Sequence, residues 1–346
     1  MTPLRLSGLV VAAVILAAAV VMARRRRGRN ADVLLLFVVG LGLLIVATTQ
    51  LPNALLNFFD FHKGGGGRIL GLTVFGLALL SLITLWLLSL NARNADQLSA
   101  VVEGLAAEQF HHTGQGERFE NKIAVLIPAY EEADNLPHVL SRIPKVVCGV
   151  ETEVLVLDDG SRDGTDRVAA REGAAVARHV TNRGGGAALR TGYRLMVESG
   201  ARIVVTLDAD GQHLPEEMPK LVEPVLSGKF DIAHGSRVLG HAEPGAFSRE
   251  LGISFFNRLV SFMTRTHVTD CSNGFRAVRA GVLPMLVLRQ QQFHTSEFVI
   301  EGIKRGVPSV EVPITVVARL HGKSKKPAVV RYGLGFANAI VRTWLR

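Results

Sequence analysis

The clearest indication of the fold is the stretch Ile203–His213 (IVVTLDADGQH). It begins with a short, continuously apolar run and continues into two carboxylates, Asp208 and Asp210, two positions apart. Such a run is typical of a strand that is buried on both faces of a parallel sheet. Ligands bind at the carboxyl ends of the strands in these sheets. We therefore expect Asp208 and Asp210 at the ligand-binding edge of an α/β domain.

Short β-rich runs alternate with helix-permissive stretches around this segment. The expected strands are Ile123–Ile127, Val154–Leu157, Ala175–Arg178, Ile203–Leu207 and Ile232–His234. The expected helices are Leu136–Ile143, Thr165–Glu172, Gly186–Ser199 and Glu216–Leu226. This order predicts a Rossmann-like, mostly parallel sheet with helices on both faces, over residues 120–326.

A polar cluster follows each expected strand. The clusters are residues 128–132, 158–165, 182–190, 208–213 and 235–237. A carboxylate at a strand end is costly to bury unless it binds something. One cluster alone could be a turn or a helix cap, but several on one edge indicate a binding site.

The spacing of Asp208 and Asp210 predicts a metal site. On a strand, residues two apart point to the same side, and Gln212 continues that series. Three oxygen ligands suit a hard divalent cation, Mg²⁺ or Mn²⁺. An Asp-X-Asp triplet alone could be a solvated loop, but its register with the other clusters favours the metal.

Other residues of these clusters are candidates for binding a nucleotide. For the base, ribose and phosphates they are Pro128, Tyr130, Glu132, Asp158, Asp159, Arg183, Arg190 and Ala209. The glycine run between the two arginines would let backbone approach a ligand. That run follows the third expected strand rather than the first, which does not indicate a dinucleotide loop.

The first 91 residues are predicted to be a membrane region. Apolar stretches at about 6–23, 33–51 and 69–90 are each close to the ~20 residues that span a bilayer. The arginine-rich run 24–29 is expected in the cytosol, which puts the N-terminus outside and the α/β domain in the cytoplasm. A signal peptide is the other interpretation of the first stretch, but it is long for one and arginines follow it directly. Residues 92–119 are expected to be a linker helix and loop.

Composition agrees with a membrane protein. The 346 residues carry a net charge of +9, are 48% hydrophobic and have a mean hydropathy of +0.27. The basic runs lie beside apolar segments, which favours anionic lipid over nucleic acid. Two cysteines, Cys148 and Cys271, are too few for a disulfide framework and suit a reducing compartment.

Together these segments resemble family 2 glycosyltransferases of the GT-A fold. They are most similar to the polyprenyl-phosphate sugar synthases, the group that includes dolichyl-phosphate mannose synthase. The matching segments, in order, are residues 127–132, 156–165, 182–192, 208–213, 235–237, 272–276 and 319–325. The sequence departs from the family's usual pattern at Glu131, where Asn is common, and at Asn273, where Ser is common.

The resemblance implies roles for individual residues. Pro128, Tyr130, Glu132 and Asp159 would line the nucleoside site, Asp208, Asp210 and Gln212 would hold the metal, Arg319 and Lys325 would close over the phosphates, and Arg237 and Arg249 would receive the acceptor's phosphate. Asp270 could contact the sugar or serve as a base, or it could orient its own loop through hydrogen bonds.

The implied reaction transfers a sugar from a nucleotide-sugar to a polyprenyl phosphate, with inversion at the anomeric carbon. The metal would neutralise charge on the departing nucleoside diphosphate. The residues after the acidic pair look more like those of members that use UDP-sugars, and GDP-mannose is the alternative donor.

Two basic amphipathic segments are expected to reach the bilayer, Phe247–Thr266 and the C-terminal helix at 327–346. A packed core helix with a solvated basic edge is the other interpretation of each. The membrane region could also support a homo-oligomer.

Two other functions were weighed. A processive polysaccharide synthase of the same fold would carry a Gln-X-X-Arg-Trp motif and later membrane helices, which this sequence lacks. A non-catalytic membrane scaffold or transport-associated protein would not need Asp208, Asp210, Gln212 and Arg319 together.

Overall fold

The computed structural model of the chain describes residues 13–17, 66–243, 247–320 and 329–346. The chain divides into two compact units, Met1–Asn94 and Ala95–Arg346. Residues 13–17 are helical. The rest of the expected span at 6–23, the whole of the span at 33–51 and the arginine-rich run lie outside the described residues.

The expected third span falls within a long helix, α4 (Gly66–His112). By length and composition, the part Gly76–His112 is the one helix of the described chain that could cross a membrane, with a window of mean hydropathy 1.5. None of that window is buried, whereas the core helix of a soluble protein would be mostly buried. Exposed large side chains such as Leu80, Leu85 and Leu88 account for this.

The end of α4 is part of the second unit, which differs from the linker expected at 92–119. Its inner face carries Val102, Ala106 and Phe110, all buried, at helical spacing. A short 3₁₀ helix, η1 (Gln115–Phe119), then leads into the sheet. The apolar stripe on the C-terminal turns of α4 therefore makes this segment a structural element of the α/β unit.

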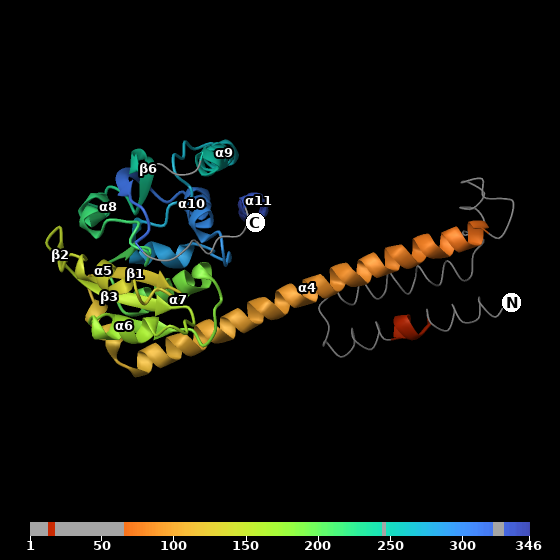
Figure 1. Cartoon of the computed structure of the whole chain (residues 1–346), viewed down its shortest axis with the longest axis horizontal. Helices are drawn as coiled ribbons and strands as arrows, with labels where there is room; N and C mark the ends of the chain where they lie inside the picture. Colours follow the sequence, from red (N-terminus) through yellow and green to blue (C-terminus); the bar gives the residue numbers. More distant parts are fainter. Residues whose placement is uncertain (1–12, 18–65, 244–246, 321–328) are drawn as a thin grey trace. The chain divides into compact units, whose positions relative to one another are not determined.

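The described residues form one sheet of eight strands (Figure 1). Its order is β2-β3-β1-β5-β7-β6-β8, with β4 also paired to β3. The strands are β1 (Ile123–Ala129), β2 (Val146–Val147), β3 (Val150–Asp158), β4 (Ala175–Arg178), β5 (Ile203–Thr206), β6 (Ile232–Ala242), β7 (Arg276–Arg279) and β8 (Ser309–Val316).

Most of the sheet is parallel, as predicted. β1 is parallel to β3 and β5, β3 to β4, and β6 to β8. β7 runs antiparallel between β5 and β6, and the two-residue β2 is antiparallel to β3. Three strands were not predicted from the sequence: β2 has two residues, β7 has an arginine at each end, and β8 contains Pro313.

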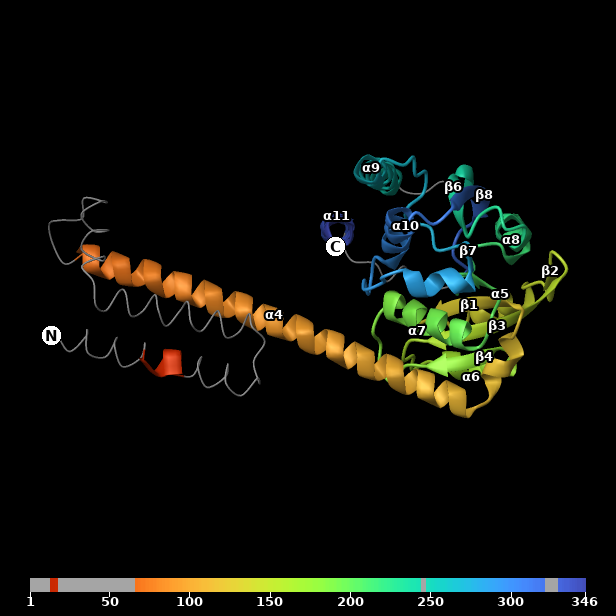
Figure 2. The same ribbon diagram turned by 180° about the vertical axis from the view of Figure 1, so that it is seen from behind.

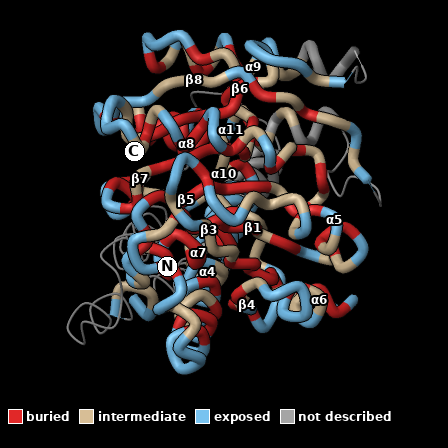
Figure 3. The backbone as a smooth tube through the Cα atoms, turned by 90° about the vertical axis from the view of Figure 1, so that its left-hand side faces the viewer, coloured by how far each residue is buried: buried red, intermediate tan, exposed pale blue. Residues whose placement is uncertain are grey.

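Helices cover both faces of the sheet, as predicted (Figure 2). Ala124 and Leu126 of β1 pack in one core with α7 (Gly185–Glu198), α10 (His294–Lys304) and the end of α4. Alternate β1 residues, such as Val125, pack in a second core with α5 (Leu136–Ser141), α6 (Thr165–Arg171) and α8 (Met218–Leu226). The central strands are buried on both sides (Figure 3).

A third core joins the last helices. It contains side chains of α9 (Phe247–Thr264), α10 and α11 (Val329–Leu345), with Phe256 and Phe293 both against the ring of Phe336. Two 3₁₀ helices, η2 (Pro215–Glu217) and η3 (Ala280–Met285), complete the described elements. The segments expected at the membrane thus pack partly on one another, while Phe255 and Phe262 of α9 are exposed.

Candidate active site

The acidic pair lies directly after β5, at the carboxyl edge of the sheet. The side chain of Asp208 is 47% exposed and that of Asp210 is 16% exposed. Asp210 Oδ1 accepts a hydrogen bond from the backbone N–H of Gln212 at 3.1 Å. Burial, and then the neighbouring carboxylate of Asp208, raise the pKa of Asp210 above its ordinary value. Such a pair favours a bound cation that neutralises both charges.

The segment after β8 covers this pair. The N–H of Val317 donates to the carbonyl of Gln212 at 3.0 Å, and the N–H of Leu320 donates to the carbonyl of Asp210 at 3.4 Å. Arg319 Nη2 lies 3.6 Å from Asp210 Oδ2 and also forms an ion pair with Glu132 Oε1. Arg319 thus joins the loop after β1 to the loop after β5.

The turn after β1 brings the other expected wall residues to the same edge. Glu132 is buried, and its second oxygen accepts from Asn135 Nδ2 at 2.6 Å. The preceding Glu131 has a positive φ of 55° and accepts from the N–H of Arg162 at 2.8 Å, which ties this turn to the loop after β3. Tyr130 is exposed at the turn, while Pro128 is the residue of β1 paired with Leu157.

Asp158 and Asp159 support loops. Asp158 is fully buried, accepts the N–H of Ser161 at 2.9 Å and lies 3.1 Å from Arg178 Nε. Burial raises the pKa of the Asp158 carboxyl, and the hydrogen bonds from Ser161 oppose this.

Each oxygen of Asp159 accepts two hydrogen bonds. The donors are His179 Nδ1 (2.7 Å), the N–H of Arg183 (2.9 and 3.1 Å, one to each oxygen) and the N–H of Gly184 (2.7 Å). All four acceptor positions are filled by protein, so Asp159 holds the loop after β4.

The side chains of Arg183 and Arg190, which were expected at the donor site, contact α4. Arg183 donates to Ser99 Oγ at 2.7 and 2.9 Å and to the carbonyl of Ala95 at 2.7 Å. Arg190 pairs with Glu103 Oε1 at 2.5 Å. Because residues 92–119 were predicted to be a linker helix and loop, these partners of the two guanidinium groups were not predicted.

Arg237 and Asp270 form a pair of their own. Asp270 is 1% exposed, and its Oδ2 accepts from Arg237 Nε at 2.7 Å and from the Arg237 N–H at 3.1 Å. Of the roles left open for Asp270, these contacts favour the one that orients the loop. Arg249 lies in α9 without a described side chain, and Lys325 lies outside the described residues.

The donor atoms at the acidic pair suit a hard divalent cation. Within the described ranges, no group of three or more His, Cys, Asp or Glu side chains is placed to hold a metal. Asp208 and Asp210 supply two carboxylates, and Gln212 Nε2 donates to the Val317 carbonyl at 3.1 Å, which fixes the amide beside them. A divalent cation here would complete its shell with diphosphate oxygens and water, as Mg²⁺ commonly does.

The sequence analysis missed the role of Gly274. A Cβ atom at this position would lie 2.9 Å from Asp208 Oδ1, so the backbone of the loop after Asp270 passes close to the carboxylate expected to bind the metal. The glycine in Ser272–Arg276 was the signal that could have shown this close approach.

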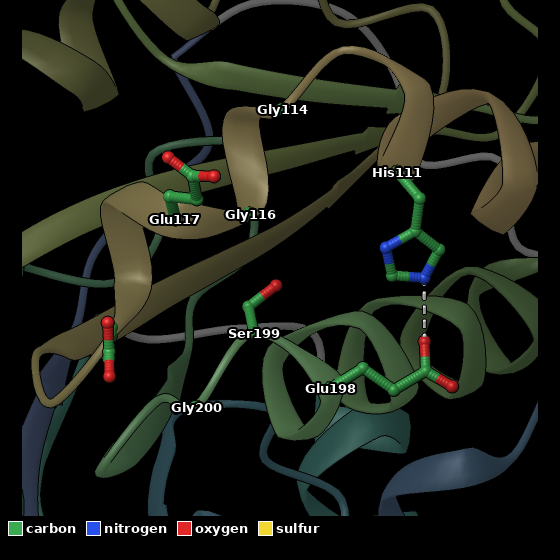
Figure 4. Close-up of a pocket in the computed structure, with 8 residues that line it drawn as sticks. His111, Gly114, Gly116, Glu117, Glu198, Ser199 and Gly200 are labelled. Atoms are coloured by element: carbon green, nitrogen blue, oxygen red, sulfur yellow. Dashed lines mark hydrogen bonds and ion pairs between the residues drawn. The ribbon is translucent and has the colours of Figure 1, made fainter.

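A pocket of about 380 Å³ lies at the opposite edge of the sheet. Figure 4 shows the side chains that line it. It is lined by residues just before β1 and β5, including Gly116 and Ser199, and there His111 Nε2 lies 2.9 Å from Glu198 Oε2. Because ligands of parallel sheets bind at the carboxyl edge, this pocket has no part in the site above.

Comparison of the sequence with known proteins identifies related glycosyltransferases. The model of glycosyl transferase family 2 matches residues 124–285. The undecaprenyl-phosphate mannosyltransferase of Micrococcus luteus is 36% identical over 216 residues, which are 59% of this chain and 87% of that protein. The polyprenol monophosphomannose synthase of Mycolicibacterium smegmatis is 34% identical over 213 residues, 58% of this chain and 79% of that protein.

A solved structure shows the same fold. It is glucosyl-3-phosphoglycerate synthase from Mycobacterium tuberculosis in complex with Mn²⁺, UDP and glucosyl-3-phosphoglycerate. It superposes with a TM-score of 0.52 at 23% identity, over 67% of this chain and 81% of that one. With its mixed sheet and covering helices of the GT-A type, the chain is a glycosyltransferase that belongs to family 2.

Proposed function

We propose that this chain transfers a sugar from a nucleotide-sugar to a polyprenyl phosphate at the membrane surface, with inversion. The observation that carries the proposal is the acidic pair Asp208 and Asp210, closed over by Arg319 at the carboxyl edge of the sheet. The two relatives named for lipid-phosphate acceptors support the choice of acceptor.

Different residues would bind the diphosphate of the donor and the phosphate of the acceptor. Asp208 and Asp210, with Gln212 beside them, would hold Mg²⁺ or Mn²⁺, which supplies charge neutralisation on the departing diphosphate. Arg319, always charged and able to donate two hydrogen bonds to one phosphate, would exchange its contacts with Glu132 and Asp210 for the diphosphate.

At the acceptor side, Asp270 holds Arg237 in place to receive the lipid phosphate, with Arg249 as the second basic residue. That phosphate is anionic at neutral pH, so the reaction needs positioning and charge stabilisation more than a general base. The nucleoside site would be lined by Pro128, Tyr130 and Glu132. Its shape would depend on the loops that Asp158 and Asp159 hold, and Lys325 would bind the donor's phosphates together with Arg319.

Two donors are candidates. The residues after the acidic pair favour a UDP-sugar, and the fold is shared with a synthase that binds UDP and Mn²⁺. GDP-mannose is the second candidate, and both relatives described above are named for mannose.

A donor screen tests the proposal. Purified full-length protein would be incubated with a short polyprenyl phosphate, Mg²⁺ or Mn²⁺, and UDP-glucose, UDP-N-acetylhexosamines or GDP-mannose. Metal-dependent formation of a polyprenyl-phosphate sugar from one donor supports it. If no donor releases its nucleotide and no donor transfers its sugar, the alternative of a non-catalytic membrane scaffold is favoured.

The exposed apolar face of α4 supports an integral membrane protein, and we place the catalytic unit in the cytoplasm. Cys148 is exposed and Cys271 is buried, so a membrane-impermeant maleimide should label Cys148 alone. Labelling is expected in inverted vesicles and not in intact cells, with Cys148→Ser as the control. Labelling of intact cells would reverse the orientation.

A further inference from the structure

The loop between α9 and β7 links the two halves of the site. At its start, Asp270 and Ser272 both contact the guanidinium of Arg237, with Ser272 Oγ 3.3 Å from Nη2. Near its end, Gly274 packs against Asp208. Asn273 therefore stands between the residue proposed for the acceptor phosphate and the carboxylate proposed for the metal.

Asn273 is held in one orientation. Its side chain is buried, and Oδ1 accepts the N–H of Phe275 at 2.9 Å. Because an N–H donor must face the amide oxygen, this bond assigns which side-chain atom is nitrogen. Arg276, itself buried, donates to the Asn273 carbonyl at 2.8 Å and fixes the backbone as well.

The amide nitrogen of Asn273 has no hydrogen-bond partner among the described residues, and it is shielded from solvent. Asn257, also buried, differs in this respect: its Nδ2 donates to the Thr269 carbonyl and its Oδ1 accepts the Cys271 N–H at 3.0 Å. Most buried polar atoms in proteins are hydrogen-bonded, because an unpaired one lowers stability. An oriented, unpaired donor in a loop whose next residue, Gly274, packs against Asp208 therefore indicates a ligand contact.

We propose that Asn273 Nδ2 donates a hydrogen bond to a hydroxyl oxygen of the transferred sugar, which makes Asn273 a specificity-determining residue. This rests on the proposed function, since the sugar lies between the diphosphate at Asp208 and the acceptor phosphate at Arg237. A single neutral donor suits a hydroxyl, whereas the phosphates have the metal and the arginines. Because Nδ2 is covered, the loop shifts slightly when the sugar binds, as loops at such sites commonly do.

The test compares binding of a nucleotide with and without its sugar. Asn273→Ser removes the amide nitrogen, adds no charge, and leaves a shorter hydroxyl that can accept the Phe275 N–H but does not reach the position of Nδ2. Binding of UDP and UDP-glucose, and of GDP and GDP-mannose, would be measured by calorimetry on the full chain in detergent with Mg²⁺. Asn273→Ala is the second variant, should the serine variant fail to fold.

We expect affinity for UDP or GDP to stay within about twofold, while affinity for the matching sugar nucleotide falls about tenfold, the effect of one lost hydrogen bond. In transfer assays, one deoxy-sugar donor should be about tenfold worse than its parent with the wild type and equal to it with the variant. Equal loss for nucleotide and sugar nucleotide, or no loss for either, overturns the proposal.

Asn257→Ser is the matched control. Because both of its amide atoms have protein partners, we expect lower thermal stability and no selective loss for the sugar nucleotide. If the variant loses affinity only for the sugar nucleotide, but the wild type transfers nothing to polyprenyl phosphate, the proposed function is wrong and Asn273 is still a sugar contact. A wild type that binds neither nucleotide pair overturns both.

Discussion

Two loops at the carboxyl edge of the sheet contain glycines and charged residues, and both were predicted to bind the donor. In the loop after β5, Asp208 and Asp210 lie two residues apart, and within the described chain Arg319 Nη2 is 3.6 Å from Asp210 Oδ2 while His213 Nδ1 is 3.8 Å from Asp208 Oδ2. In the loop after β4 and the first turns of α7, Arg183 and Arg190 both have side-chain partners in α4. The difference teaches that a charged residue at a strand end indicates a ligand only when the protein does not already supply its partner.

Loss of Asp210 should give the largest effect. Asp210→Ala removes the more buried of the two carboxylates proposed for the metal, and we expect metal-dependent transfer to fall by at least about a hundredfold, into the assay background. The variant should remain folded and in the membrane, which a melting curve and membrane fractionation would check. Activity like that of the wild type would refute the metal assignment.

Arg319→Ala should come next. It removes the cation that bridges Glu132 and Asp210 and that would reach the diphosphate, so we expect kcat to fall about 10- to 100-fold. Arg319→Lys keeps the charge but loses the two-pronged geometry and should recover only part of the rate. Full recovery in the lysine variant would show that charge alone matters there.

The raised pKa of Asp210 predicts a stability effect of intermediate size. The folded state binds this proton more tightly than the unfolded state, so its stability falls as pH rises from the ordinary Asp range through the raised pKa. In EDTA at neutral pH, Asp210→Asn should therefore melt a few degrees above the wild type, with the gap closing at acidic pH. Mg²⁺ should stabilise the wild type more than the variant, and a variant that melts lower in EDTA contradicts this.

The smallest effect on donor affinity is expected at Arg190, in the first turns of α7, after the loop that follows β4. Arg190→Ala breaks a partly buried ion pair with Glu103, and we expect about 1–3 kcal/mol less stability, with donor KM changed less than about threefold. Glu103→Gln is the matched variant from the α4 side. Urea unfolding and donor kinetics would be compared, and a tenfold rise in KM at unchanged stability would return Arg190 to the donor site.

The sequence predicted the features that depend on local pattern. The five expected strands, the four helices between them and the position of Asp208 after a buried strand all follow from apolar runs of the right length, and the structure confirms them. It did not predict contacts made by segments distant in sequence. The side chain of Arg183 binds Ser99, which lies 84 positions earlier in the sequence. β7 is a strand because it pairs with β5 on one side and with β6 on the other.

The two glycines next to the acidic pair, Gly211 in sequence and Gly274 in space, also have a consequence for protein engineering. Gly211, with a φ of 76°, leaves room for Leu320, whose Cδ1 would lie 2.4 Å from any Cβ added there, and Gly274 leaves room for Asp208. A methyl group at position 211 would be strained by the positive φ and would displace the Leu320 side chain, and one at position 274 would displace the Asp208 carboxylate. Libraries that diversify donor preference should therefore keep both glycines. Leu320 and the exposed Tyr130 contribute flexible side chains instead. Substitutions that change donor preference are therefore expected among the residues that surround the two carboxylates, and not at the two glycines.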